Sequence, residues 1–366
     1  MYRIYTGQVA KALGKTRPFL PTTRLTNCKG GRFIVERTQD MKIIPLLLLF
    51  AAFCGSHYCQ AQKKAPVPII FDSDFGPDYD DVGAIALLHA LADSGEANIL
   101  ATIACNKHPW AAAALNVFNT YFRRPAIPIG VPKGNAVNIP AWQKWDSVVV
   151  ARYPHSIRTN DEAMDAVALY RKILATQPDG SVTVVTVGFL TNLANLLQSP
   201  ADQYSSLAGV DLVRKKVKQL VCMAGKFPSG KEFNVEKDAI ASGKVFTQWP
   251  SPIIFSGFEI GVEIRTGLPL INNNAIQKSP VKDVFGICIP MSEQDKQGRM
   301  SWDETAVLVA IRGWERYYTL QPGRITTTGH GDNGWDANGK GHYYLVKKMP
   351  APAITNIINQ LIMHQP

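Results

Sequence analysis

The chain has 366 residues, 46% of them hydrophobic, which is enough to bury a large core in one α/β domain or in two smaller ones. The formal net charge is +10, but residues 1–61 hold nine Lys and Arg against two acidic residues, a net of +7, so the remainder carries only +3. No basic face is left to explain, and we therefore expect no nucleic acid partner.

The N-terminal region has the pattern of a secretory signal. Residues 41–61 begin with a basic position, continue with an apolar run over 43–53 and end in a small-residue cleavage site. The run is too short to span a bilayer, so we expect cleavage after Ala61 and an exported product, periplasmic or secreted, with no membrane insertion. Residues 1–40 are expected to be disordered upstream sequence or, alternatively, a genuine N-terminal extension. Residues 62–366 would form the functional domain.

The first elements after the signal surround a cluster of acidic residues. An apolar run over 67–71 predicts a buried parallel strand, and apolar periodicity from Val82 predicts a helix. Five carboxylates lie between them: Asp72, Asp74, Asp78, Asp80 and Asp81. Because so many like charges repel one another, a bound cation is the simplest compensation. The ordinary alternative is that Asp80 and Asp81 only cap the helix.

Strand and helix patterns then alternate along the chain. Further strands are predicted over 98–105, 127–131, 182–187, 218–223 and 253–255, and further helices over 110–122, 161–176, 191–198 and 305–312. A terminal segment over 351–366 is apolar at helical spacing and is expected to pack on the sheet or on another subunit. The pattern predicts an α/β fold, a single open, mostly parallel, doubly wound sheet with helices on both faces.

In such a sheet, residues that follow the strands converge on one crevice. The candidates are Asn106, Lys107 and His108, then Gly188 and Phe189, then Met223, Glu232 and Asn234, and finally Asp303 at the start of a late helix. Each also has an ordinary interpretation: Asn106 as a turn residue, Glu232 as a surface acid and Asp303 as a helix cap. Three cysteines follow the signal region (Cys105, Cys222 and Cys288), and their apolar surroundings predict buried free thiols.

The acidic stretch resembles a known family signature. Residues 72–81, Asp-Ser-Asp-Phe-Gly-Pro-Asp-Tyr-Asp-Asp, are similar to the N-terminal motif of the inosine-uridine-preferring nucleoside hydrolases, in a variant with a longer loop. Further similarities occur in the family's order: Asn106, the Val-Gly-Phe-Leu-Thr-Asn-Leu-Ala segment over 187–194, Met-Ala-Gly over 223–225 with Glu-Phe-Asn over 232–234, and Asp303. The resemblance covers roughly residues 66–313.

This resemblance implies a calcium-dependent hydrolase that cleaves the N-glycosidic bond of a nucleoside or related ribosyl compound. It implies that Ca²⁺ is held by Asp74, Asp81, the main-chain carbonyl of Val187 and Asp303. It also implies that ribose is bound by Asp80, Asn106, Met223, Glu232 and Asn234. Ca²⁺ prefers six to eight oxygen ligands, and we nominate Asp74 as the catalytic base that takes a proton from the attacking water. Homo-oligomers are common in the family, although this sequence carries no distinct interface signal.

The sequence departs from the family on the side of the nucleobase. Trp302 stands where the family has a His before the last metal-binding Asp, so the expected proton donor is missing. Trp302 is expected to stack on a base, to narrow the pocket or simply to pack in the core. His108 and His330 are candidate replacement acids. The glycine-rich residues 326–342 are predicted to form a flap over the pocket or a hairpin loop.

Two other functions compete with the hydrolase. Asp72 and Asp74 after a strand also resemble the start of haloacid dehalogenase-type phosphohydrolases, with Asp72 as nucleophile. The missing His before Asp303 favours a periplasmic nucleoside- or sugar-binding protein that has lost turnover.

Overall fold

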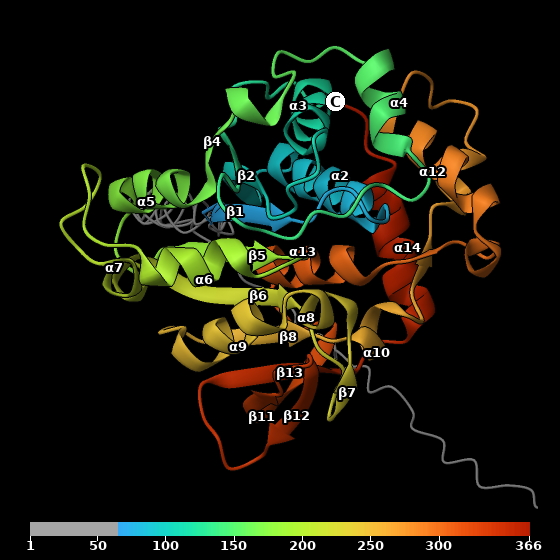
Figure 1. Ribbon diagram of the computed structural model, residues 1–366. Helices are drawn as coiled ribbons and strands as arrows, with labels where there is room; N and C mark the ends of the chain where they lie inside the picture. The colour runs from blue at the N-terminus through green and yellow to red at the C-terminus, as the bar shows by residue number, and fades with distance from the viewer. Residues whose placement is uncertain (1–64) are drawn as a thin grey trace, which may run out of the picture. The chain divides into compact units, whose positions relative to one another are not determined.

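The computed structural model describes residues 65–366 (Figure 1). The predicted signal peptide, its cleavage site and the upstream segment lie outside the described residues. Within the described part of the chain, no helix is long and apolar enough to cross a membrane.

A large sheet forms the centre of the described chain, and its labelled strands from β4 to β11 follow one another from the upper to the lower part of Figure 1. In spatial order they are β4 (Met164–Asp165), β3 (Ile129–Val131), β2 (Ala97–Ala104), β1 (Val67–Ser73), β5 (Val182–Thr186), β6 (Val217–Met223), β8 (Ile253–Ser256), β13 (His342–Lys347), β11 (Tyr318–Thr327), β12 (Asp332–Asp336) and β7 (Gly230–Lys231). The pairings from β4 to β13 are parallel, and the last three are antiparallel. A separate pair joins β9 (Arg265–Thr266) to β10 (Arg299–Met300).

The chain reverses its direction across the sheet between β1 and β5. From β1 it adds β2, β3 and β4 on one side, and it then returns to place β5, β6 and β8 on the other. At this reversal the Val187 amide donates a hydrogen bond to the Asp72 carbonyl at 2.8 Å, which joins the ends of the two central strands. Open α/β sheets bind their ligands in the crevice that such a reversal leaves at the carboxyl ends of the strands.

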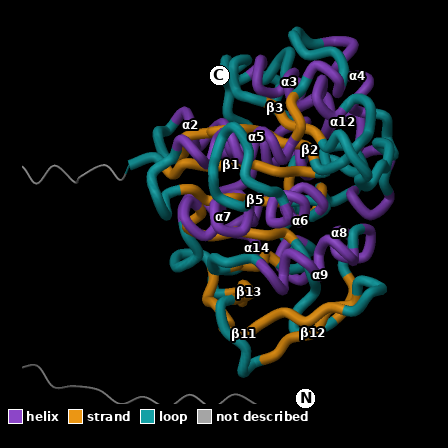
Figure 2. Tube along the Cα trace, turned by 60° about the vertical axis from the view of Figure 1, so that its left-hand side comes forward, coloured by secondary structure: helices purple, strands orange, loops and turns teal. Residues whose placement is uncertain are grey.

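Helices cover both faces of the sheet, as the purple and orange segments of Figure 2 show. One apolar core contains side chains of α2 (Asp80–Asp93), α3 (Ala111–Tyr121), α12 (Pro280–Met291), α13 (Trp302–Arg312) and α14 (Ala351–Ile362). The other contains side chains of α5 (Ala166–Thr176), α6 (Thr191–Gln198), α7 (Gly209–Lys216) and α9 (Ala239–Gln248). Because side chains alternate along a strand, Ile69 and Phe71 of β1 enter the first core while Ile70 enters the second.

Shorter helices complete the fold. They are α4 (Trp145–Arg152), α8 (Phe233–Lys237), α10 (Phe258–Gly261), α11 (Leu268–Ile271), and the 3₁₀ turns η1 (Asn160–Glu162) and η2 (Glu293–Asp295).

The predicted fold class is confirmed, with one element misplaced. The helix predicted from residue 161 begins at Ala166, because residues 160–162 form η1 and the Asp165 carboxylate accepts the Ala168 amide as an N-cap. The glycine-rich residues 326–342 belong mainly to the hairpin of β11 and β12, visible at the lower edge of Figure 2. All three cysteines beyond the signal region are buried and unpaired, as predicted.

Candidate active site

A cavity of about 220 Å³ opens where β1, β5 and β6 end. Its lining includes most of the residues singled out in the sequence: Asp74, Asp80, Val187, Met223, Glu232, Asn234, Trp302 and Asp303. It also includes Asp78 of the predicted acidic cluster, together with residues that the sequence analysis did not assign to the site: Trp142, Lys231, Phe233, Phe258, Gln294 and Arg299. The fold therefore brings acidic residues from opposite ends of the chain to one crevice.

Close packing fixes the acidic residues of this cavity. Asp74 follows β1, and Gly188 after β5 lies so near that a Cβ atom there would be 2.4 Å from the Asp74 amide nitrogen. Gly83 of α2 has the same function against α13, since its Cβ would lie 1.9 Å from Oε1 of Glu304. Gly188 thus allows the segment that carries Val187 to approach Asp74, and Gly83 allows the segments that carry Asp81 and Asp303 to approach each other.

Burial and mutual repulsion dominate the electrostatics of the cluster. Asp74, Asp81 and Asp303 are each at most 4% exposed. Burial raises the pKa of all three carboxyls well above the usual range, and the charges of neighbouring aspartates raise it further. The Ser73 hydroxyl donates to Oδ1 of Asp81, whereas Oδ2 of Asp81 is buried without a hydrogen-bond partner among the described residues. Such a site favours a cation.

Asp80 connects α2 to the start of α13. Its Oδ1 accepts hydrogen bonds from Nε and Nη2 of Arg299 at 3.2 and 2.6 Å. Its Oδ2 accepts the main-chain amides of Trp302 and Asp303 at 3.2 and 3.4 Å. Asp80 therefore caps α13 from another element and holds Asp303 in place. Its predicted contact with ribose stays a prediction.

A second wall of the cavity is built around Glu232, which is the N-cap of α8. Its carboxylate accepts the amides of Gly225, Asn234 and Val235 at 3.1, 2.8 and 3.2 Å. Burial raises its pKa to about 7, although these hydrogen bonds oppose the shift. The Asn234 amide group donates to the carbonyls of Val187 and Met223 at 3.3 and 3.2 Å, which places the predicted sugar-binding residues side by side.

This wall is supported from the C-terminal part of the chain. β7, which ends just before Glu232, pairs with β12. Asn333 of β12 accepts the Lys226 amide and donates to the Lys226 carbonyl, both at 2.8 Å.

Asn106 does not line the cavity but binds the main chain of Asp74, which does. Its Nδ2 donates to the carbonyls of Asp74 and Ile139 at 3.0 and 2.7 Å, and its Oδ1 accepts the Ile139 amide at 3.0 Å. Asn106 is fully buried, so in this conformation it positions the main chain of Asp74. Its role in binding ribose remains a prediction.

The donor set suits a hard cation, although the side chains are not arranged around one. In residues 65–366, no group of three or more His, Cys, Asp or Glu side chains has the arrangement of a metal centre as it stands. The chemistry nevertheless fits, because Asp74, Asp81 and Asp303 supply only oxygen ligands and the unpartnered Oδ2 of Asp81 is available to an ion.

Comparison with known proteins identifies the family. The family model "Inosine-uridine preferring nucleoside hydrolase" matches residues 69–352. The chain belongs to this family. It is therefore a glycosidase that acts on N-glycosyl compounds. The comparison with curated proteins gave no match.

Several solved structures share the fold of this nucleoside hydrolase. An inosine-guanosine nucleoside hydrolase has a TM-score of 0.65 at 19% identity over 82% of this chain and 99% of that one. A purine-preferring ribonucleoside hydrolase from Gardnerella vaginalis has a TM-score of 0.65 at 16% identity over 81% and 98%. A plant nucleoside hydrolase has a TM-score of 0.63 at 18% identity over 81% and 99%.

No histidine of the described chain lines the cavity of this nucleoside hydrolase. His108 binds Asp146 with an Nε2 to Oδ2 distance of 2.5 Å, and His330 lies in the exposed turn between β11 and β12. Trp302 is half-buried at the cavity, with its indole Nε1 donating to the Phe258 carbonyl at 2.8 Å. At position 302, where the family has a proton donor, the cavity is therefore lined by the aromatic side chain of Trp302.

Asp72, the nucleophile of the competing phosphohydrolase hypothesis, does not reach the cavity of the nucleoside hydrolase. Its side chain is fully buried, accepts the Tyr170 hydroxyl at 2.8 Å and faces the amide group of Asn192 at 3.3 Å. Burial raises its pKa to about 7. These contacts make Asp72 a structural group beneath the site and count against its acting as a nucleophile.

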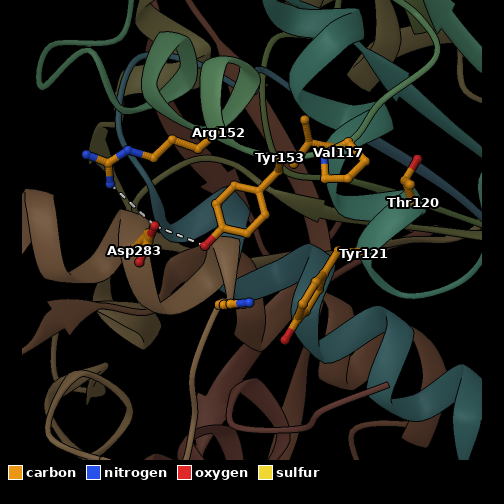
Figure 3. A pocket seen from close by; sticks show the side chains of 8 residues that line it. Val117, Thr120, Tyr121, Arg152, Tyr153 and Asp283 are labelled. Carbon is orange, nitrogen blue, oxygen red and sulfur yellow. Dashed lines mark hydrogen bonds and ion pairs between the residues drawn. The ribbon is translucent and has the colours of Figure 1, made fainter.

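A larger cavity of about 660 Å³ lies elsewhere in the nucleoside hydrolase, between α3, α4 and the start of α12 (Figure 3). There the Asp283 carboxylate accepts the Tyr153 hydroxyl at 2.9 Å and pairs with Arg152 at 3.5 Å. None of the carboxylates that follow β1 contributes to its lining, so we assign the chemistry to the smaller cavity.

Proposed function

We propose that the protein is an exported, calcium-dependent hydrolase that cleaves the N-glycosidic bond of a ribonucleoside or a related ribosyl compound. The observation that carries the proposal is that Asp74, Glu232 and Asp303, from distant parts of the chain, line a single cavity. Family membership gives the reaction class, and the residues of the cavity support the choice of sugar and metal.

The metal would be held by Asp74, Asp81, Asp303 and the main-chain carbonyl of Val187. These are hard oxygen donors, which Ca²⁺ prefers. When bound, the ion supplies positive charge that offsets the repulsion among the carboxylates and lowers the pKa of a nearby water. The carboxylates would turn toward the ion from the positions that they have in the structure.

The remaining steps belong to side chains of the protein. Asp74 accepts the proton of the water that attacks C1′, and Asn106 holds the main chain of Asp74 in place. Glu232 and Asn234 present a carboxylate and an amide to the sugar. Their oxygens stabilise the positive charge that develops on the ribose ring as the glycosidic bond breaks.

A panel of ribonucleosides, assayed for reducing sugar with added Ca²⁺, tests this function. We expect ribose release by the wild-type protein and none by Asp81→Ala, which removes a carboxylate of the proposed metal site. Release of phosphate from p-nitrophenyl phosphate in place of ribose would contradict the proposal. Export is tested separately by the N-terminal sequence of the mature protein, which we expect to begin at Gln62.

A nucleoside-binding protein without turnover is the second candidate. It is favoured by one observation, the lack of a histidine among the described residues that line the cavity. Saturable nucleoside binding without ribose release, measured by calorimetry on the same panel, would select it over the hydrolase.

A further inference from the structure

A third cavity, with a different set of side chains, lies beyond the carboxyl ends of β2 and β3. Its volume is about 490 Å³, and its lining includes three basic side chains, Lys107, Lys133 and Arg158, together with the ring of Trp110. None of its lining residues also lines the candidate active site. This cavity, which we call the cationic cavity, therefore has a chemistry that the hydrolase function does not use.

The protein does not neutralise the charge of the cationic cavity. None of the ion pairs within residues 65–366 involves Lys107, Lys133 or Arg158. Asp161 is the one carboxylate among the described lining residues, so three basic residues stand against one acidic residue, a formal net charge of +2. A concave site with excess positive charge attracts anions.

Hydrogen bonds connect the segments that surround the cationic cavity. Nζ of Lys107 donates to the Gly134 carbonyl at 3.0 Å, and Nζ of Lys133 donates to the Asn160 carbonyl. Nδ2 of Asn160 in turn donates to the His108 carbonyl at 2.9 Å. An ammonium group has three N–H donors, so each lysine is held at the cavity by one hydrogen bond and keeps donors for an anion.

Trp110 gives the cationic cavity an aromatic surface. It precedes α3 and is 41% exposed, whereas a tryptophan side chain is usually well buried. No ring-to-ring contact within residues 65–366 involves Trp110. Its ring is therefore available to stack on a flat group of a ligand, as aromatic side chains do on nucleobases.

We propose that the cationic cavity binds a nucleoside phosphate, with the nucleobase stacked on Trp110 and the phosphate bound by Lys107, Lys133 and Arg158. An inorganic anion would leave the exposed ring unused, and a neutral nucleoside would leave the cations unpaired. The volume of about 490 Å³ lies within the range of about 300–1,000 Å³ that small-molecule sites have.

The role of the cationic cavity is binding and not hydrolysis. None of the carboxylates that follow β1 lines it, so the groups proposed for the attack on the glycosidic bond are not present there. The proposal goes beyond the hydrolase function and does not depend on it.

Calorimetric titrations with 5′-AMP and with inorganic phosphate test the proposal. The titrations use protein that carries Asp81→Ala, in a chelator, so that the proposed catalytic site does not turn over the nucleotide. We expect 5′-AMP to bind more tightly than inorganic phosphate, because only the nucleotide contacts both the cations and the aromatic ring.

Variants separate the two kinds of contact. Lys133→Gln should weaken the binding of 5′-AMP and of phosphate alike by about 10-fold, since a hydrogen bond to a charged group is lost. Trp110→Ala should weaken the binding of 5′-AMP by about 10-fold through loss of stacking and leave that of phosphate unchanged. Trp110→Phe keeps an aromatic face and should restore most of the affinity for 5′-AMP, which distinguishes stacking from a local folding defect.

Two control variants should leave the affinity for 5′-AMP unchanged. In Lys348→Gln, the lost Nζ also donated to a main-chain carbonyl, that of Glu315 at 2.5 Å, but Lys348 does not line the cationic cavity. Trp142→Ala controls for binding in the candidate active site, because Trp142 is 57% exposed and lines that cavity.

The inference is overturned if 5′-AMP binds no more tightly than phosphate or gives no heat of binding at millimolar concentration. Unchanged binding in Lys133→Gln, or equal losses for both probes in Trp110→Ala, would also overturn it. A loss of 5′-AMP binding in Trp142→Ala would assign the nucleotide to the candidate active site instead. Ribose release by the wild-type protein is a separate result, and its failure would leave this inference intact.

Discussion

Gly188→Ala is the substitution that most directly tests how the site is positioned. The new methyl carbon would lie 2.4 Å from the Asp74 amide nitrogen and 2.8 Å from Oδ1 of Asp74. An ordinary contact needs about 3.4 Å, so the two segments must separate by about 1 Å. Main-chain atoms on both sides prevent an escape by side-chain rotation. Asp74 would therefore move relative to Asp81 and Asp303.

Overpacking of this kind costs about 1–3 kcal/mol of unfolding free energy. A shift of about 1 Å in a reacting group lowers turnover by about 100-fold. Urea unfolding measures the change in unfolding free energy, and ribose release measures turnover. Calorimetric titration measures the affinity for Ca²⁺.

Gly286→Ala is the matched control for Gly188→Ala. Gly286 lies within α12, and a Cβ there would meet no atom within 4 Å. We expect this variant to be fully active and more stable by roughly 0.5–1 kcal/mol, since Ala is favoured over Gly inside a helix. Wild-type stability, turnover and Ca²⁺ affinity in Gly188→Ala would refute the argument that this close approach positions Asp74.

Three more predictions concern charge. Asp81→Ala should abolish Ca²⁺ binding as well as turnover, so a normal calorimetric titration would remove it from the proposed metal site. Asp80→Asn should lower the unfolding free energy by on the order of 3 kcal/mol, because it removes one partner of the buried pair with Arg299; an unchanged urea midpoint would contradict this. Burial raises the pKa of Glu232 to about 7 from 4.5, so the metal-free folded protein binds more protons than the unfolded chain between those values. Its stability should then fall as the pH rises through this window, and the fall should be smaller in Glu232→Gln when melting temperatures are compared in a chelator.

The parallel part of the sheet was predictable because its signals are local. β1, β2, β5 and β6 are apolar runs of strand length, and the polar residues that follow them converge by topology alone. The site residues Asp74, Asp303 and Glu232 could thus be placed near one another from their order in the chain.

The contacts of Arg299 and Asp80 and the strands β11 and β12 could not be predicted, because they depend on tertiary contacts that no local sequence pattern encodes. Arg299 sits in a two-residue strand, and its partners Asp78 and Asp80 lie far away in the sequence, so nothing near it marks a buried cation. Asp80 was assigned to the sugar, but no pattern near it indicated that both of its oxygens accept hydrogen bonds from residues around the start of α13. The sequence pattern did not predict β11 and β12 as strands, because these segments contain glycine and polar residues and their pairing comes from tertiary contacts.

The pairing of β7 with β12 makes the C-terminal hairpin a support for the wall of the cavity that carries Glu232 and Asn234. No described residue of β12 lines the cavity. Asn333 of β12 nevertheless forms two hydrogen bonds with the main chain of Lys226, which lies six residues before Glu232. A change in the length or tilt of this hairpin would therefore displace this wall while the carboxylate cluster keeps its position. Deleting it would leave that wall without its backing, even in a protein that retains every proposed ligand.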